Sequence, residues 1–475
     1  MGISLGRMDV SAAVIATFPY SMHRRKKGVA SAMKVIQSVT AALILSLTFC
    51  AATMAQESKP KLVVLITNTR IFDGENEKLA DGMSVLVEGN KISQIAKSIP
   101  APAGATVIDT NGKVLMPGLS DMHWHVMFNA PAMPVLLTAD IGYLTLLAAQ
   151  SAHDDLMRGF TTVRDVGGNS FAVKRAIDEG LIPGPRIYPS GPMISQSSGH
   201  SDNRPRNEPG HETYLEKNHM LAVADGVPEV MTAVRRNLRM GATQIKLAAG
   251  GGVSSDYDPL DVTEYTFEEL KAAVDVARTW NTYVAVHVNT DAAVRQAIAA
   301  GVISIEHGFL MEEGTLKLMA DKGVWFSMQP LLNDEDAIYF PPGSANEAKW
   351  IEVTDGTDKV IKLAKKYGVK TAFGTDVLFD PALGKKHGKL LAKLKRWYTP
   401  YEALKMATYD NAQLVKLCGP RDPYPGEIGV VKEGALADLL LVDGNPLENL
   451  DLVADPDKNF VLIMKDGVIY KNTIN

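Results

Sequence analysis

Asp121-Met122-His123-Trp124-His125 is the stretch that decides the fold, and it follows the turn Pro117-Gly118-Leu119. Side chains alternate along a β-strand, so two histidines two residues apart point to the same face. The apolar run at residues 114–116 leads into this stretch. We therefore expect His123 and His125 to lie at the end of a buried strand, where two imidazoles can converge on a metal ion.

Strand-like and helix-like segments alternate through the middle of the chain, from residue 117 to residue 417. Strands are predicted at 161–164, 186–189, 244–247, 283–287, 304–306, 325–328 and 371–373. Helices are predicted at 140–158, 172–179, 227–240, 267–280, 291–300, 313–322 and 355–367. With the strand that carries His123 this makes eight strands with helices between most of them. The pattern favours an α/β fold, a (β/α)8 TIM barrel, over a doubly wound sheet.

Both ends of the chain are rich in short strands. Residues 62–116 contain β-rich runs that are separated by turns such as Gly89-Asn90. Similar β-rich runs occur at 437–442 and 460–470. We expect one small β-sandwich domain formed from both ends of the chain. The predicted domains are 61–116 and 418–475 for the two parts of the sandwich, and 117–417 for the barrel.

The first 55 residues have the order of a secretory signal peptide. A basic patch, His23-Arg24-Arg25-Lys26-Lys27, precedes an apolar run at 41–52 that ends in small residues, with Ala55 last before cleavage. The apolar run is short for a bilayer span, although an uncleaved anchor is the alternative. Only Cys418 remains after cleavage, so no intramolecular disulfide can form. The expected location is secreted or periplasmic.

Composition limits the class of partner. The 475 residues carry a formal net charge of -5, with 46% hydrophobic and 22% charged residues. These values are ordinary for a soluble globular protein. They give no reason to expect a nucleic acid, or a membrane after signal cleavage, as a partner.

Four further residues come at or near the ends of the predicted strands: Lys246, His287, His307 and Asp376. Barrel active sites form at the carboxyl ends of the strands, so these side chains should converge with the two histidines on one mouth. Imidazole and carboxylate ligands suit zinc or a similar divalent ion. Each residue could instead be a satisfied rim residue. Lys246 fits a metal site only if it is carbamylated, because a protonated amine repels a cation.

Three other segments could contact a substrate. Gly250, Gly251 and Gly252 would let the backbone approach a ligand closely, although a plain turn is the alternative. The segment 195–218 carries His200 and Arg204 and either caps the pocket, binding a substrate carboxylate, or forms a solvated loop. The segment 327–346, with Tyr339, is a second candidate lid.

These motifs together resemble those of the metal-dependent amidohydrolase superfamily. The matching pieces are residues 116–125, Thr161-Thr162-Val163-Arg164-Asp165, Gln244-Ile245-Lys246, His287, Ile305-Glu306-His307-Gly308, Gly374-Thr375-Asp376, 399–404 and 434–439. The resemblance covers essentially everything after residue 60. Within the superfamily the sequence is most similar to Xaa-Pro-type dipeptidases, with ochratoxinase and imidazolonepropionase-like proteins nearby.

The resemblance implies a centre of two divalent metal ions, expected to be zinc. His123, His125 and Asp376 would hold one ion, His287 and His307 the other, and carbamylated Lys246 would bridge them. Such ions lie ~3.5–4 Å apart and share a hydroxide that attacks the scissile carbonyl. Asp376 would pass the proton to the leaving amine, which makes Asp376 and Lys246 the catalytic candidates.

The implied substrate is a small amide, namely a dipeptide, an N-acyl amino acid or an ochratoxin-like amide, and the implied assembly is a homo-oligomer. One alternative is a mononuclear deaminase or cyclic-amide hydrolase of the same superfamily, which would lack the bridging lysine. A metal-free binding or scaffold protein on a degenerate barrel is the other. The filled positions at all six ligand sites argue against that reading.

Overall fold

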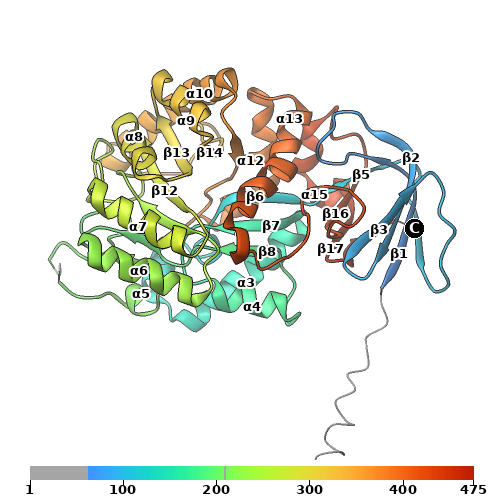
Figure 1. Ribbon diagram of the computed structural model, residues 1–475, viewed down its shortest axis with the longest axis horizontal. Coiled ribbons are helices and arrows are strands. Elements are labelled where there is room, and N and C mark those ends of the chain that lie inside the picture. Colours follow the sequence, from blue (N-terminus) through green and yellow to red (C-terminus); the bar gives the residue numbers. More distant parts are fainter. Residues whose placement is uncertain (1–61, 208–209, 475) are drawn as a thin grey trace, which may run out of the picture. The chain divides into compact units, whose positions relative to one another are not determined.

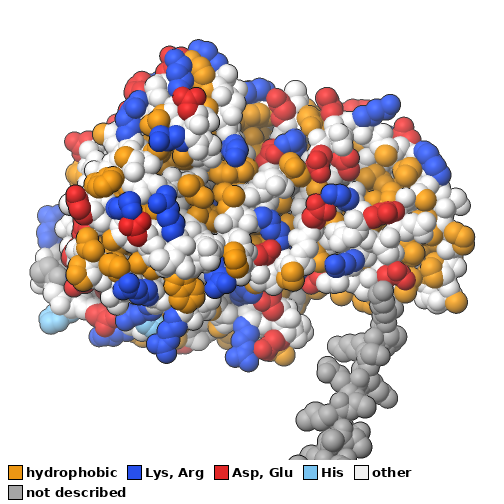
Figure 2. All heavy atoms as spheres, viewed as in Figure 1, with side chains coloured by type: hydrophobic (Ala, Val, Ile, Leu, Met, Phe, Trp, Pro, Cys, Tyr) orange, Lys and Arg blue, Asp and Glu red, His pale blue; other side chains and the backbone are white. Residues whose placement is uncertain are grey.

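The computed structural model describes residues 62–207 and 210–474 (Figure 1), so the predicted leader at 1–55 lies outside the described residues. Within these ranges, no helix combines the length and the apolar character needed to cross a membrane. Acidic and basic side chains are interspersed on the face shown in Figure 2.

Strands from both ends of the described chain form one eight-stranded sheet. Its order is β18-β17-β16-β5-β1-β2-β3, and β4 pairs with β1. Strand β16 runs antiparallel to β5, so strands from the N-terminal and C-terminal parts of the described chain lie side by side (Figure 1). The strands are β1 (Val63–Ile71), β2 (Ala80–Glu88), β3 (Lys91–Ala96), β4 (Thr106–Asp109), β5 (Val114–Pro117), β16 (Leu439–Val442), β17 (Phe460–Lys465) and β18 (Val468–Asn472).

The middle of the chain forms two parallel sheets, in the orders β6-β7-β8 and β10-β9-β11-β12-β13-β14-β15. Most of these strands are buried along their length, as strands covered on both faces must be. The strands are β6 (Leu119–Trp124), β7 (Phe160–Asp165), β8 (Arg186–Pro189), β9 (Met193–Ser195), β10 (Leu221–Val223), β11 (Ile245–Ala248), β12 (Val284–Thr290), β13 (Ser304–Leu310), β14 (Trp325–Met328) and β15 (Thr371–Phe373).

Helices connect the parallel strands, which confirms the predicted α/β class. The helix α7 begins with a capping box between Thr266 and Glu269, and α8 ends at Gly301 in the left-handed conformation that glycine adopts readily. The longer helices are α3 (Ile141–Met157), α4 (Phe171–Asp178), α6 (Gly226–Met240), α7 (Phe267–Thr279), α8 (Asp291–Ala300), α9 (Glu313–Lys322) and α10 (Ala345–Tyr367). The shorter ones are α2 (Met133–Thr138), α5 (Tyr214–Lys217), α11 (Pro381–Gly384), α12 (His387–Ala392), α13 (Pro400–Lys405), α14 (Asn411–Val415) and α15 (Pro456–Asn459).

The apolar run before the His-x-His stretch belongs to a different strand from the histidines. Residues 114–116 lie in β5 of the mixed sheet, whereas His123 lies in β6 of a parallel sheet. The chain changes sheet at Gly118, where an added Cβ would lie 2.1 Å from Thr161 Oγ1. His123 lies near the end of a buried strand, as predicted, but that strand is β6 and begins after the apolar run.

The helix predicted at 355–367 begins earlier, at Ala345. The Ser344 side chain accepts a hydrogen bond from the backbone of Glu347 at 3.2 Å and caps the helix there. This extension brings Asn346, Lys349 and Trp350 onto a helix that packs beside the strand ends.

Hydrogen bonds join the two parallel sheets at two places. At one edge, the backbone of Thr243 donates to Pro189 O at 2.8 Å. At the other, the Asn411 amide donates to Ser120 O in β6 and to Phe373 O in β15, both at 3.0 Å. These bonds connect β8 to the segment before β11, and β6 to β15.

Candidate metal centre

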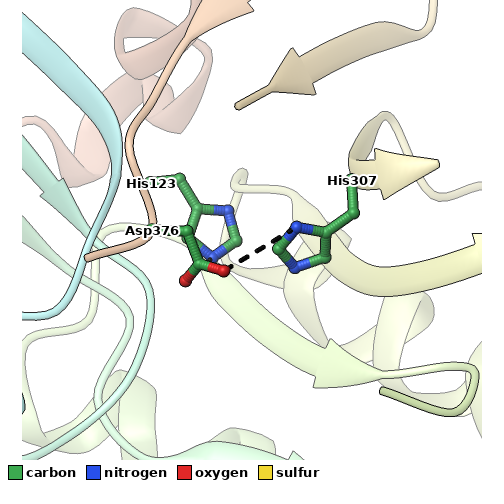
Figure 3. Close-up of side chains that lie close together, drawn as sticks. All are labelled: His123, His307 and Asp376. Atoms are coloured by element: carbon green, nitrogen blue, oxygen red, sulfur yellow. Dashed lines mark ion pairs between the residues drawn. The ribbon is translucent and has the colours of Figure 1, made fainter. Parts of the chain in front are cut away.

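Three of the predicted ligands face one another at the strand ends: His123 from β6, His307 from β13 and Asp376 after β15 (Figure 3). His123 Nε2 lies 3.2 Å from Asp376 Oδ1, and His307 Nδ1 lies 3.9 Å from Asp376 Oδ2. One ligand atom from each side chain lies within 4.8 Å of the other two, a spacing that allows metal ligation. His125 Nε2 also lies 3.2 Å from Asp376 Oδ1, so both histidines of the His-x-His pair reach this carboxylate.

His123 is oriented by a buried charge pair to which sequence reasoning gave no role. Its Nδ1 lies 2.9 Å from Glu306 Oε2, which leaves Nε2 for the pocket. Arg164 Nη2 donates to both carboxylate oxygens of Glu306 at 2.7 Å, and all three side chains are buried. Burial alone would raise the pKa of Glu306, but the Arg164 charge and the His123 contact outweigh it and hold that pKa below its usual range. A carboxylate behind a ligand histidine fixes its ring and tautomer.

His287 and His307 are held in the neutral form that binds metals. Burial, and next the charge on His123, lower the pKa of His307 to about 3. The pKa of His287 is also lowered, by burial and by the neighbouring His200 and His307. His307 Nδ1 lies 2.8 Å from Gln329 Oε1, and the amide of Gln329 donates to Ser327 O.

Lys246 on β11 is a buried amine without a partner. Its side chain is 1% exposed and forms neither a hydrogen bond nor an ion pair with any residue of the described chain. Burial lowers the pKa of Lys246 to about 8, although the negative charges of Glu306 and Asp376 oppose the shift. An unpaired buried ammonium is costly, whereas the neutral amine is the form that reacts with carbon dioxide. The site therefore fits a carbamylated lysine.

The segment that carries His200 and the loop after β11 both line the pocket. The ring of His200 stacks on that of His287 at 3.8 Å, and its Nδ1 lies 2.8 Å from Ser255 Oγ and 3.3 Å from Asp258 Oδ2. At Gly252 an added Cβ would lie 2.1 Å from the His200 ring, so only glycine fits there. His200 lines both small cavities at the candidate ligands.

The other residues that were predicted to contact a substrate lie at different distances from this centre. Gly251 O lies 3.3 Å from His287 Nε2, whereas an added Cβ on Gly250 would meet Val288 on the strand side. Arg204 forms an ion pair with Asp202, with 2.7 Å between Nη2 and Oδ2. Arg204 also lines a larger outer cleft of about 860 Å³. Tyr339 is 78% exposed and lines neither cavity at the metal centre.

Two small cavities open on the candidate ligands. One, of about 80 Å³, is lined by His123, His125, Lys246 and the other ligand candidates. The second, of about 60 Å³, is bordered by His287, His307 and Asp376 and extends towards α10. The larger outer cleft includes none of these residues, so the chemistry belongs to the small cavities.

Comparison with known proteins agrees with this geometry. The family described as "Amidohydrolase family" matches residues 114–475. Ochratoxinase from Aspergillus niger is 33% identical over 380 residues, covering 75% of this chain and 76% of that protein. A prolidase complexed with N-methylphosphonate-L-proline superposes with a TM-score of 0.79 at 32% identity, covering 86% of this chain and 100% of that one. A Xaa-Pro dipeptidase with bound methionine gives 0.75 at 28% identity, covering 86% and 100%.

Proposed function

We propose, because this chain belongs to the amidohydrolase family, that it hydrolyses an amide or peptide bond of a small substrate at a centre of two divalent metal ions. One observation carries the proposal. The buried Lys246 lines one cavity together with the four histidine ligand candidates and the carboxylate of Asp376, a donor set that suits divalent cations. Relatives that include an ochratoxinase and Xaa-Pro dipeptidases support a dipeptide, an N-acyl amino acid or an ochratoxin-like amide as substrate.

The proposed ligand assignment uses all six candidates. His123, His125 and Asp376 would hold one ion, His287 and His307 the second, and carbamylated Lys246 would bridge them. The donor set of imidazoles and carboxylates suits zinc. The ions would supply Lewis acidity, polarising the scissile carbonyl and making water a stronger nucleophile at neutral pH.

The side chains would supply positioning and proton transfer. Asp376 lies between His123 and His307, and its carboxylate would accept the proton of the attacking water and pass it to the leaving nitrogen. Glu306, held by Arg164, keeps the His123 ring in place during this transfer. The Ser255 and Asp258 contacts orient His200 towards the substrate, where it would donate to a carbonyl or carboxylate oxygen.

Metal content and a substrate screen test the proposal together. Purified protein should hold two divalent ions per chain and should hydrolyse members of a panel of dipeptides, N-acyl amino acids and arylamides. A single ion together with deaminase activity would favour the mononuclear alternative. No ion and no hydrolysis would favour a binding protein.

We also propose that the two parallel sheets close into a (β/α)8 barrel and that the mixed sheet folds as a sandwich beside it. The hydrogen bonds of Thr243 and Asn411 at both seams support closure. The strands shared by the two ends of the described chain support domains at 61–116, 117–417 and 418–475. We further propose that the protein is secreted or periplasmic and that it assembles as a homo-oligomer.

A further inference from the structure

The loop at residues 252–258, after β11, borders both the metal cavities and the outer cleft. Its residues 253–255 line one or both of the small cavities, whereas Asp256 and Tyr257 line the cleft. The loop forms neither helix nor strand. Its position therefore depends on its contacts with neighbouring elements.

The loop holds the ring of His200. Ser255 Oγ lies 2.8 Å from His200 Nδ1, and Asp258 Oδ2 lies 3.3 Å from the same atom. Asp258 Oδ2 also accepts from the backbone of Gly252 at 2.6 Å, which ties the two ends of the loop together. The His200 ring stacks on that of His287 at 3.8 Å between ring centres. A displacement of the loop would therefore move a ring that lines both small cavities.

Two side chains of α10 bind the same loop by its backbone. Lys349 Nζ donates to three carbonyl oxygens, each at 2.9 Å, namely those of Gly252, Ser255 and Asp258. Asn346 Nδ2 donates to Val253 O at 2.6 Å. Residues three apart lie on the same face of a helix, so one face of α10 satisfies four carbonyls of a loop that has no regular structure of its own.

The charge of Lys349 is used within the protein. Lys349 lines the outer cleft, where a free ammonium would be a candidate for a substrate carboxylate. An ammonium has three donors, and the loop carbonyls take all three. Its Nζ also lies 4.0 Å from Asp258 Oδ1, a buried oxygen that accepts no hydrogen bond from the described residues. Since a buried carboxylate without a nearby cation is costly, Lys349 stabilises the charged form of Asp258 beside His200.

We propose that Lys349 is a positioning residue for the hydrolysis. Its ammonium takes the place of a bound cation and holds the 252–258 loop, and the loop in turn holds His200 against His287. Because its three donors are occupied, the lysine would act on the substrate only through His200. The inference rests on the proposed amide hydrolysis, in which His200 donates to an oxygen of the substrate.

Lys349→Met tests the positioning role, because methionine keeps an unbranched side chain and removes the charge and the donors. We expect kcat/KM for an amide substrate to fall roughly tenfold to 10²-fold, since a small misplacement away from the chemistry can cost that much. Metal content should stay at the wild-type level, because the hydrogen bonds of Lys349 go to the loop. Lys362→Met is the matched control on the same helix, at a side chain that is 67% exposed, and should keep the wild-type rate.

A double variant separates the positioning of His200 from general support of the fold. If the lysine acts through His200, adding Lys349→Met to His200→Ala should lower kcat/KM by less than about twofold further. Losses that multiply in the double variant would overturn the inference, because they would show that Lys349 acts independently of His200. A fall in rate that follows loss of bound metal would overturn it as well.

Restoring the charge provides a rescue experiment. Lys349→Cys treated with 2-bromoethylamine regains an ammonium at the length of lysine, whereas 1-bromopropane adds a neutral group of the same shape. With modification confirmed by mass, we expect activity to recover with the first reagent alone. Equal activity after both treatments would overturn the role of the charge. Wild-type protein treated in the same two ways controls for the native cysteines.

Hydrogen exchange tests the loop contacts without a substrate. In Lys349→Met the amides of residues 250–260 should exchange faster than in the wild type, while those of β12 and β13 keep their rates. Unchanged exchange at 250–260 would overturn the inference and leave amide hydrolysis standing. Failure of wild-type protein with two bound ions to cleave any amide in the panel would instead overturn the proposed function, and the catalytic role of the lysine with it.

Discussion

His387 and Asp121 form a fully buried pair in which the imidazole Nε2 lies 2.8 Å from the carboxylate Oδ2. The same carboxylate accepts from the backbone of His123 at 2.8 Å and from Thr375 Oγ1 at 2.6 Å. The His387 ring lies parallel to that of Trp124, at 4.4 Å between ring centres. The pair therefore joins the strand that carries the His-x-His ligands to the segment that carries Asp376.

Replacing His387 should loosen both ligand segments at once. His387→Gln would leave Asp121 buried beside a neutral group, and changes behind metal ligands typically lower metal affinity or activity 10–100-fold. We expect a loss of that size in zinc affinity, measured by competition with a chelator. His153→Gln, at a half-exposed position on α3, is the control. Unchanged affinity in His387→Gln would show that Asp121 holds both segments without help.

Lys246→Ala should remove most activity and most bound metal, because the proposed bridge between the ions would be lost. A short carboxylic acid or bicarbonate should restore part of both by filling the vacated space. In the wild-type protein, labelled bicarbonate should give a carbamate carbon signal that the variant lacks. Lys271→Ala is the control, because Lys271 is exposed and pairs with Asp275. A Lys246→Ala protein with the wild-type rate and two tightly held ions would disprove the binuclear assignment.

Asp376→Asn should separate metal binding from proton transfer. The amide keeps one ligand oxygen but cannot take a proton, so turnover should fall by roughly 10²–10⁴ while much of the metal remains. Metal content and rate are measured on the same sample, with Asp380→Asn, a helix cap a few residues away, as control. Near-normal turnover in the loaded variant would mean that another group moves the proton, with His200 the first to examine.

Glu264 should make the protein less stable as the pH rises. Burial, and next the charge of Asp258, raise its pKa from 4.5 to about 8. The folded state therefore binds a proton that the unfolded state has released, and stability falls between those pH values by up to about 1.4 kcal/mol per pH unit. Glu264→Gln should remove this slope. Urea unfolding at pH 5 and pH 8 checks it, and equal pH dependence in both proteins would contradict it.

The predicted signal peptide at residues 1–55 determines the expected mass of the exported protein. If residues 1–55 form a cleaved signal peptide, the mature chain begins near Gln56. Intact-mass measurement of secreted or periplasmic protein checks this, and a mass that includes residues 1–55 would exclude cleavage.

The sequence predicted the alternation of strands and helices well, because most of the buried parallel strands are short β-rich runs and helices such as α6 and α7 are amphipathic. The bounds of β8, β14, β15, α8 and α9 are those predicted. The six ligand candidates could be found because residues at the ends of parallel strands share one edge. These patterns are local, so they can be recognised in a single sequence.

The supporting contacts could not be predicted in the same way. Arg164 and Glu306 are 142 positions apart, and His387 and Asp121 are 266 apart, so only the folded chain brings them together. The sheet change at Gly118 was missed because the residues on both sides of it are equally apolar. The start of α10 was missed because its first turns are largely exposed and have a weak apolar pattern.

The pairing of β5 with β16 sets the order in which the enzyme can mature during synthesis. Gly118, which directly precedes the ligand strand β6, donates its backbone N–H to Asp438 O at 2.9 Å, and residues 439–442 pair with 114–117. A ribosome has made every metal-ligand candidate by residue 376, yet the anchor for the first of them emerges more than sixty residues later. A nascent or truncated chain that ends before β16 therefore holds all six ligand candidates but lacks the contacts that fix the segment leading into the first pair.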